Sequence, residues 1–145
     1  MYDAILLPTT GGPEMNEVID HVGSLADRYD ATVHVLSVMD ARNRFESPAS
    51  GIAGNAWDDG ERSRAHEAVA DADAALPDVT TERVVRSGVP HEEILEYVEE
   101  SSVQLVVMGT HGRTGLDHYL IGSVAERVVR RCAVPVLTVP LADSE

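Results

Sequence analysis

Five short runs of apolar and β-branched residues are spaced along the chain, with a longer segment of helical pattern in each interval. The runs are residues 4–8, 32–38, 80–86, 104–108 and 134–139. The first run, and the fourth after Gln104, are continuously apolar, which is typical of strands that are buried on both faces. The pattern therefore predicts a sheet of five mostly interior strands.

The intervening segments repeat apolar residues at helical spacing. We expect helices over residues 14–29 and 63–76, a third that begins at Pro90, and a fourth over residues 122–131. Proline suits the first turn of a helix, and the acidic residues of the third segment suit its solvent face. The side chains expected to face inward are Val18, Val22, Leu25 and Tyr29 in the first helix, Ile94, Leu95 and Val98 in the third, and Val124, Val128 and Val129 in the fourth.

Alternation of strands and helices over the whole length indicates an α/β fold, in which a parallel sheet carries helices on both faces. With 145 residues, the chain has the size of a single domain spanning residues 1–145. One stretch, residues 40–60, is irregular and rich in Gly, Ser, Pro and Asn. It is either a lid over a site, anchored there by Trp57, or a loop tip without fixed structure.

The charge balance excludes several partners. The chain has 11 basic and 25 acidic residues, a net charge of −14, and every basic residue is arginine. Long-range repulsion disfavours binding to nucleic acid or to an anionic membrane surface. An acidic, lysine-free and alanine-rich composition is instead typical of a halophilic protein, which stays soluble where salt screens its self-repulsion.

Little in the sequence points to a metal site or to export. Cys132 is the single cysteine, so neither an internal disulfide nor a thiolate-rich metal site is expected. The histidines lack zinc-ligand spacing, and His34, between two valines, has a structural role in this interpretation. The first residues lack the regions of a signal peptide, and no apolar run has membrane-spanning length. We expect a cytoplasmic protein.

The chemistry is concentrated after two of the predicted strands. Pro8 ends the first, Thr9 and Thr10 follow it, and a glycine-rich segment, residues 109–115, follows the fourth. The next helix opens with Gly122-Ser123. Glycines allow the backbone to approach a ligand, and a helix N-terminus offers free N–H groups to an anion. The segment lacks the lysine of a Walker loop, but together with Arg113 it predicts an anion site.

These residues resemble a known family. Gly109, Gly112 and the pair Gly122-Ser123, separated by two and nine residues, match the nucleotide-binding signature of the universal stress proteins. The surrounding sequence is similar from Tyr2 to Pro140. The resemblance implies a sheet of order 3-2-1-4-5 and a homodimer in which the last strand, residues 134–139, pairs with its symmetry mate. It also implies ATP as ligand, with Mg²⁺ held through the triphosphate.

Carried over residue by residue, the resemblance gives a complete site. Adenine would lie near Pro8, Thr10, Val38 and Met108, and phosphates at the fourth helix. The predicted nucleotide-binding residues are Pro8, Thr9, Thr10, Val38, Met108, Gly109, Thr110, His111, Gly112, Arg113, Thr114, Gly115, Gly122, Ser123, Val124 and Ala125. No catalytic residue is assigned, because His111 has no visible nucleophile or carboxylate partner.

One position departs from the family pattern. Thr10 stands where the family usually has an acidic residue, and Gly11-Gly12-Pro13 replaces the usual Gly-Ser-Glu. Loss of a charge-assisted hydrogen bond costs about 1.5–3 kcal/mol. The favoured hypothesis is an ATP-binding stress or signalling module with little or no turnover. Two alternatives stay open: a slow ATPase switch that uses His111, and a dimeric interaction protein that binds no nucleotide.

Overall fold

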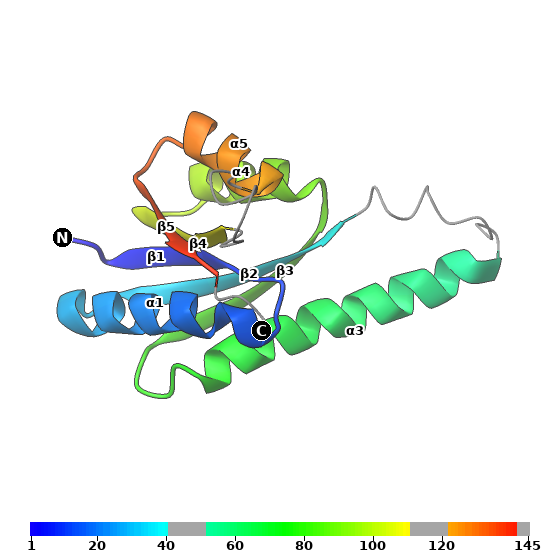
Figure 1. The fold of residues 1–145 in the computed structure, drawn as a ribbon, viewed down its shortest axis with the longest axis horizontal. Coiled ribbons are helices and arrows are strands. Elements are labelled where there is room, and N and C mark those ends of the chain that lie inside the picture. The colour runs from blue at the N-terminus through cyan, green and yellow to red at the C-terminus, as the bar shows by residue number, and fades with distance from the viewer. Residues whose placement is uncertain (41–51, 111–121, 142–145) are drawn as a thin grey trace, which may run out of the picture.

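The computed structural model of the protein describes residues 1–40, 52–110 and 122–141, and for residues 52–58 it describes the backbone alone. The strands β1 to β5 form one five-stranded sheet of order β3-β2-β1-β4-β5, and all of its pairings are parallel. The strands are β1 (Ala4–Pro8), β2 (Thr32–Asp40), β3 (Thr81–Gly88), β4 (Leu105–Thr110) and β5 (Val136–Pro140). The predicted α/β class and the order that the resemblance implied are confirmed (Figure 1).

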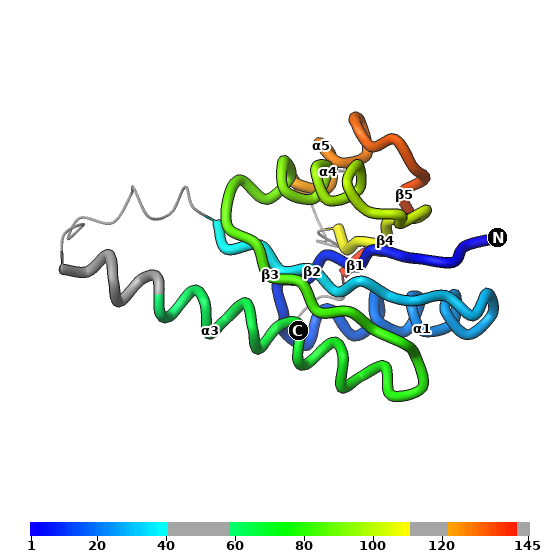
Figure 2. The backbone as a smooth tube through the Cα atoms, turned by 180° about the vertical axis from the view of Figure 1, so that it is seen from behind, coloured from blue at the N-terminus to red at the C-terminus, as the bar shows by residue number. Residues whose placement is uncertain are grey.

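Helices cover both faces of this sheet. A short 3₁₀ turn, η1 (Pro13–Met15), leads into α1 (Asn16–Tyr29), which lies with α3 (Ile52–Ala74) on one face. The other face carries α4 (Pro90–Glu100) and α5 (Ser123–Arg131). Seen from behind in Figure 2, β3 forms the edge of the sheet between α3 and α4. None of the described helices has the length and apolar character needed to cross a membrane.

Two expectations about the helices were wrong. The stretch 40–60 was expected to be irregular, but Asp40 still belongs to β2 and α3 already begins at Ile52. Residues 41–51 and the side chain of Trp57 lie outside the described part, so the lid hypothesis is not addressed. Val129 was expected to face inward, yet it is 45% exposed. One residue corresponds to about 100° around a helix, so Val129 cannot share the inward direction of its buried neighbour Val128.

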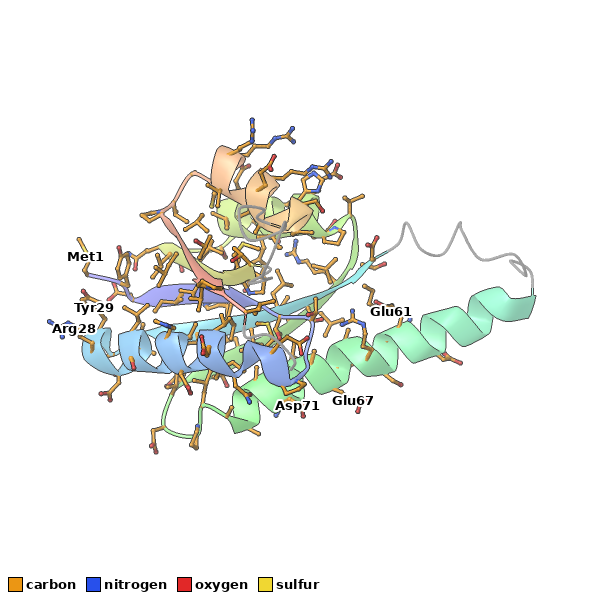
Figure 3. All side chains as sticks on the ribbon, viewed as in Figure 1. Met1, Arg28, Tyr29, Glu61, Glu67 and Asp71 are labelled. Carbon is orange, nitrogen blue, oxygen red and sulfur yellow. The ribbon has the colours of Figure 1, made fainter. Side chains whose placement is uncertain are left out.

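The sheet separates two apolar cores, and side chains fill the space between the helices and the strands on each side (Figure 3). Leu7 and Val35 face α1 and α3, and Leu6 and Leu36 face α4 and α5. This alternation along a buried parallel strand explains why its sequence is apolar at every position. The cores hold the strands rigidly and so fix the positions of the strand ends, where the candidate site lies.

Two buried polar side chains are hydrogen-bonded to each other on the side of the sheet that α4 and α5 cover. The hydroxyl of Tyr97 and Nδ1 of His34 are hydrogen-bonded at 2.6 Å, and both residues are buried. The guanidinium of Arg86 lies 4.9 Å from the centroid of the Tyr97 ring. Burial raises the pKa of Tyr97, and the nearby charge of Glu82 acts in the same direction. His34 therefore has the structural role that the sequence predicted.

We expect Tyr97→Phe to lower the free energy of unfolding at pH 7 by about 1–3 kcal/mol, because the buried nitrogen of His34 loses its partner. Since folding raises the pKa of Tyr97, the unfolded chain releases this proton first, and the tyrosine's contribution to stability falls as pH rises above about 10. Urea unfolding at pH 7 and at a series of alkaline pH values measures both effects. A difference between wild type and variant that stays constant across this range would contradict the assignment.

Candidate nucleotide-binding site

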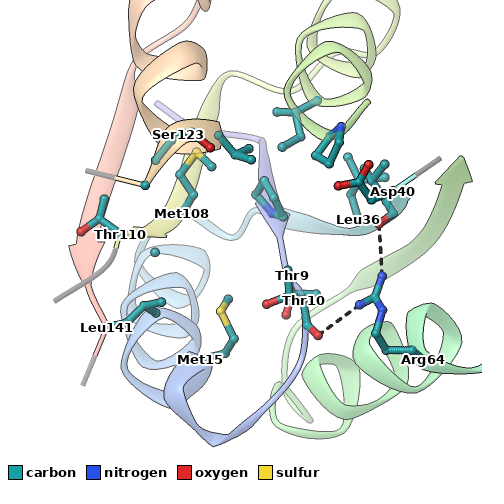
Figure 4. Close-up of a pocket in the computed structure, with 18 of the residues that line it drawn as sticks. Thr9, Thr10, Met15, Leu36, Asp40, Arg64, Met108, Thr110, Ser123 and Leu141 are labelled. Atoms are coloured by element: carbon teal, nitrogen blue, oxygen red, sulfur yellow. Dashed lines mark hydrogen bonds between the residues drawn. The ribbon is translucent and has the colours of Figure 1, made fainter. Parts of the chain in front are cut away.

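A pocket of about 430 Å³ opens at the carboxyl ends of β1, β2 and β4. In this sheet order the chain runs outward from β1 in one direction through β2 and β3, and in the other through β4 and β5. Such a reversal of strand order is where open α/β sheets bind ligands, and the volume is within the range of small-molecule sites. Figure 4 shows side chains from several elements converging on this pocket.

The end of β1 is shaped by a tight turn. The backbone N–H of Thr9 donates to the carbonyl of Leu36 at 2.8 Å, and the Thr9 hydroxyl accepts from the N–H of Gly11 at 3.0 Å. Gly11 and Gly12 have φ values of 85° and 90°, a region that favours glycine. The two glycines turn the chain away from the sheet and leave Thr10 beside the pocket.

The N-terminus of α5 forms the opposite side of the pocket. Gly122 is the N-cap residue, Ser123 is the first helical residue, and among the described residues no side chain caps this end. The N–H groups of the first helical turn have no partners within the helix, so they are available to an anion. Gly122, Ser123, Val124 and Ala125 all line the pocket. The geometry is that of an anion cradle, with the helix dipole adding positive potential.

The end of β4 supplies Met108, Gly109 and Thr110 to the same pocket. A Cβ atom on Gly109 would collide with Cδ2 of Leu141. Leu141 is held there by a 2.8 Å hydrogen bond from its N–H to the carbonyl of Thr110. A larger residue at position 109 would force Leu141 to shift, so the packing of the chain that follows β5 favours glycine here, apart from any contact with a ligand.

Every described residue of the predicted site lines this one pocket. The set comprises Pro8, Thr9, Thr10, Val38, Met108, Gly109, Thr110, Gly122, Ser123, Val124 and Ala125. The other predicted positions, His111, Gly112, Arg113, Thr114 and Gly115, lie outside the described residues. The structure brings together residues from distant parts of the chain, while their role in binding stays a prediction.

The sequence did not predict the contribution of α3. Glu61 and Arg64 line the pocket, and the Arg64 guanidinium donates to the carbonyl oxygens of Thr10 and Val38. The only sequence feature that could have pointed to Arg64 is that it is an arginine in a chain with few cations. Lining residues also missed are Met15, Leu36, Asp40, Pro90, Ile94 and Leu141, most of which complete an apolar wall.

The lining determines what the pocket can do chemically. The apolar wall suits a flat ring, and the uncapped helix end suits an anionic group. The described lining contains no histidine, cysteine or lysine, and its ionisable side chains are Asp40, Glu61 and Arg64. The described part of the pocket is thus equipped for binding a ligand with an apolar ring and an anionic end.

Comparison with known proteins agrees with this geometry. The chain is 33% identical to the universal stress protein MJ0531 of Methanocaldococcus jannaschii, over 100% of this chain and 86% of that protein. The solved structure of protein MJ0577 from the same organism is similar over 99% of both chains, with a TM-score of 0.82 and 29% identity. The fold and the sequence therefore point to the same relatives.

More distant solved structures share the fold and contain nucleotides. One is a universal stress protein in complex with cAMP, with a TM-score of 0.69 and 23% identity over 97% of this chain and 98% of that one. Another is the Archaeoglobus fulgidus protein in complex with dAMP, with a TM-score of 0.71 and 16% identity over 94% and 97% of the two chains. The description of the universal stress protein family matches residues 1–140, and the chain belongs to this family.

Proposed function

We propose that the protein is a nucleotide-binding stress or signalling module whose ligand is ATP, with little or no turnover. The observation that carries this proposal is the pairing, in one pocket, of an apolar wall with the uncapped N-terminus of α5. A base and a triphosphate need these two environments at opposite ends of a site. That relatives have been solved with cAMP and dAMP supports an adenine nucleotide in particular.

The base would lie near Pro8, Thr10, Val38 and Met108, and the phosphates would lie at the start of α5. Backbone N–H groups at Ser123 and Val124 would bind phosphate oxygens, and the Ser123 hydroxyl would add a donor. Mg²⁺ would be held mainly by the phosphates and water rather than by a protein cage. This chain's own contribution is binding and orientation, not proton transfer.

The proposal is tested by heat-denaturing purified protein and separating the released small molecules by ion-exchange chromatography. We expect released ATP and, after its removal, a rise in melting temperature when ATP and Mg²⁺ are added back. At a ligand concentration of 100 times Kd, one-site binding adds about 2.7 kcal/mol of stability. If neither effect is seen, the remaining hypothesis is a dimeric interaction protein that binds no nucleotide. Steady release of phosphate over hours would instead indicate a slow ATPase.

A homodimer through β5 completes the proposal. β5 is an edge strand of the sheet, and a free edge exposes unpaired backbone groups that a second copy can pair with. Leu137 on β5 is 38% exposed, and Val129 on the neighbouring helix α5 is also exposed. Apart from Met1, these two are the exposed large hydrophobic residues of the described chain. They supply apolar surface for such an interface.

We further propose that the protein is one domain and works at high salt. The sheet joins strands from residue 4 to residue 140, which supports a single folding unit. The charge of −14 without any lysine supports a halophilic protein, because salt screens repulsion between two such chains in a dimer. If the protein works at high salt, we expect its melting temperature to rise steeply with KCl concentration.

A further inference from the structure

One side chain of α3 links two strand ends at the base end of the pocket. Nη1 of Arg64 lies 3.2 Å from the carbonyl oxygen of Thr10, and Nη2 lies 3.2 Å from that of Val38. Thr10 follows β1, and Val38 belongs to β2. Figure 4 shows the guanidinium at the side of the pocket, with a dashed line to each of these oxygens. The two Nη atoms of Arg64, called the fork below, thus link the ends of two neighbouring strands.

The fork is itself held in place. Glu61, one helical turn earlier, accepts from Nε of Arg64 at 3.1 Å and from Nη2 at 2.8 Å. The Arg64 side chain is 35% exposed and that of Glu61 18% exposed, so water screens the pair only in part. In Figure 3, Glu61 projects from the side of α3 that faces the sheet, and Glu67 from the other side. Because a guanidinium is planar, anchoring one edge fixes the direction of the other donors.

The position of this fork bears on the unusual Thr10. An acidic side chain at this position would give the base end a charged group, and Thr10 has none. Arg64 instead acts on the backbone of the same residue and on the wall residue Val38 opposite it. A hydrogen bond with a charged donor is about twice as strong as a neutral one. The pairing of β1 with β2 ends at Pro8 and Leu36, and Arg64 extends the link between the two strands to Thr10 and Val38.

We propose that Arg64 is a positioning residue for the nucleotide base: by holding the carbonyls of Thr10 and Val38 together, it sets the width of the slot and hence the preference for a purine. The proposal rests on the proposed function, since it concerns a nucleotide in this pocket. It assigns Arg64 no contact with the phosphates, which would lie at α5. A slot of fixed width discriminates by the size and outline of the base, so selectivity is the property that reports on Arg64.

The test compares ATP with UTP in wild type, Arg64→Ala and Arg64→Lys by calorimetric titration in the presence of Mg²⁺. We expect Arg64→Ala to lower the preference for ATP over UTP by about tenfold, the effect of losing about one charge-assisted hydrogen bond. Arg64→Lys keeps the charge but cannot span both carbonyls, so the preference should fall in this variant as well. Melting temperatures establish that each variant is folded.

Two controls separate positioning from charge and from general damage. Arg62→Ala removes the same charge from the same helix, but Arg62 is exposed and lines a different pocket beside Arg83 and Arg86. This variant should keep the wild-type preference. Ser123→Ala acts at the phosphate end and should weaken ATP and UTP by the same factor.

The outcomes distinguish this inference from the proposed function. If wild type binds and the preference falls in Arg64→Ala and Arg64→Lys but not in the controls, the inference is supported. If wild type binds ATP and the preference is unchanged in Arg64→Ala, or falls equally in Arg62→Ala, the inference is overturned while the proposed function stands. If wild type binds neither triphosphate, the proposed function fails and the inference fails with it.

Discussion

Gly122→Val is expected to weaken ATP binding at least about a hundredfold, equivalent to about 2.7 kcal/mol, while the protein still folds. Gly122 occupies the N-cap position of α5, at the side of the pocket where the phosphates would lie. A valine there brings three carbon atoms next to N–H groups that a phosphate must reach. The bulk excludes the anion and removes the close approach of backbone to ligand that glycine permits.

The backbone tolerates this substitution. Gly122 has φ −55° and ψ 151°, which any residue adopts. Valine is a poorer N-cap than glycine, so we expect a loss of about 1 kcal/mol or less in stability. Calorimetric titration and thermal melting of the same samples separate the two effects.

Gly60→Val is the matched control for this prediction. Gly60 lies in α3, and an added Cβ would meet nothing within 4 Å. The same chemical change there should leave ATP affinity within about twofold of wild type, since surface substitutions have small effects. Equal affinity of Gly122→Val and wild type would show that the phosphates lie elsewhere.

The sequence predicted the strands well because their pattern has a single physical cause. β1 was predicted with the bounds that the structure gives, since a strand covered on both faces must be apolar throughout. The end of β2 was placed two residues early, at Val38, although Met39 is buried and Asp40, which also reaches the pocket, still belongs to the strand. The pattern identifies burial, and it fails where a strand leaves the core to form the site.

The first turns of α3 were missed for a related reason. Gly54, Asn55 and Gly60 are weak helix formers, and side-chain periodicity is poor there. The local sequence therefore gives no clear signal that this helix begins at Ile52. The site was missed for another reason. Glu61 falls between the predicted irregular stretch and the predicted helix 63–76, and Arg64 lies within that helix. Helical spacing alone does not show that either residue reaches the carboxyl ends of β1 and β2.

Part of the candidate site could be predicted from the sequence, and part of it could not. Glycines in a spaced signature are visible in sequence because they serve the backbone, and the structure explains Gly109 by its contact with Leu141. The link from Arg64 to Thr10 and Val38 joins residues 54 and 26 positions apart. Such contacts depend on how a helix packs against the sheet, which residue spacing does not specify.

Leu137→Asp is expected to convert the proposed dimer into a monomer, with a dissociation constant at least about a hundredfold higher than that of wild type. Leu137 is an exposed apolar residue on the edge strand β5. In a two-fold symmetric interface the same surface meets itself, so each substitution places two carboxylates in one apolar contact. Their desolvation and mutual repulsion oppose association.

Sedimentation velocity at high salt over a range of protein concentrations measures this effect, because salt screens the general repulsion between two chains of charge −14. Ser87→Asp provides the control: Ser87 is exposed on β3, the opposite edge of the sheet, and the substitution adds the same charge. It should leave the dimer intact. A wild-type monomer at tens of micromolar, or a Leu137→Asp variant as dimeric as Ser87→Asp, would exclude β5 as the interface. Since Leu137 does not line the pocket, ATP affinity in the Leu137→Asp monomer then tells whether each subunit holds a complete site.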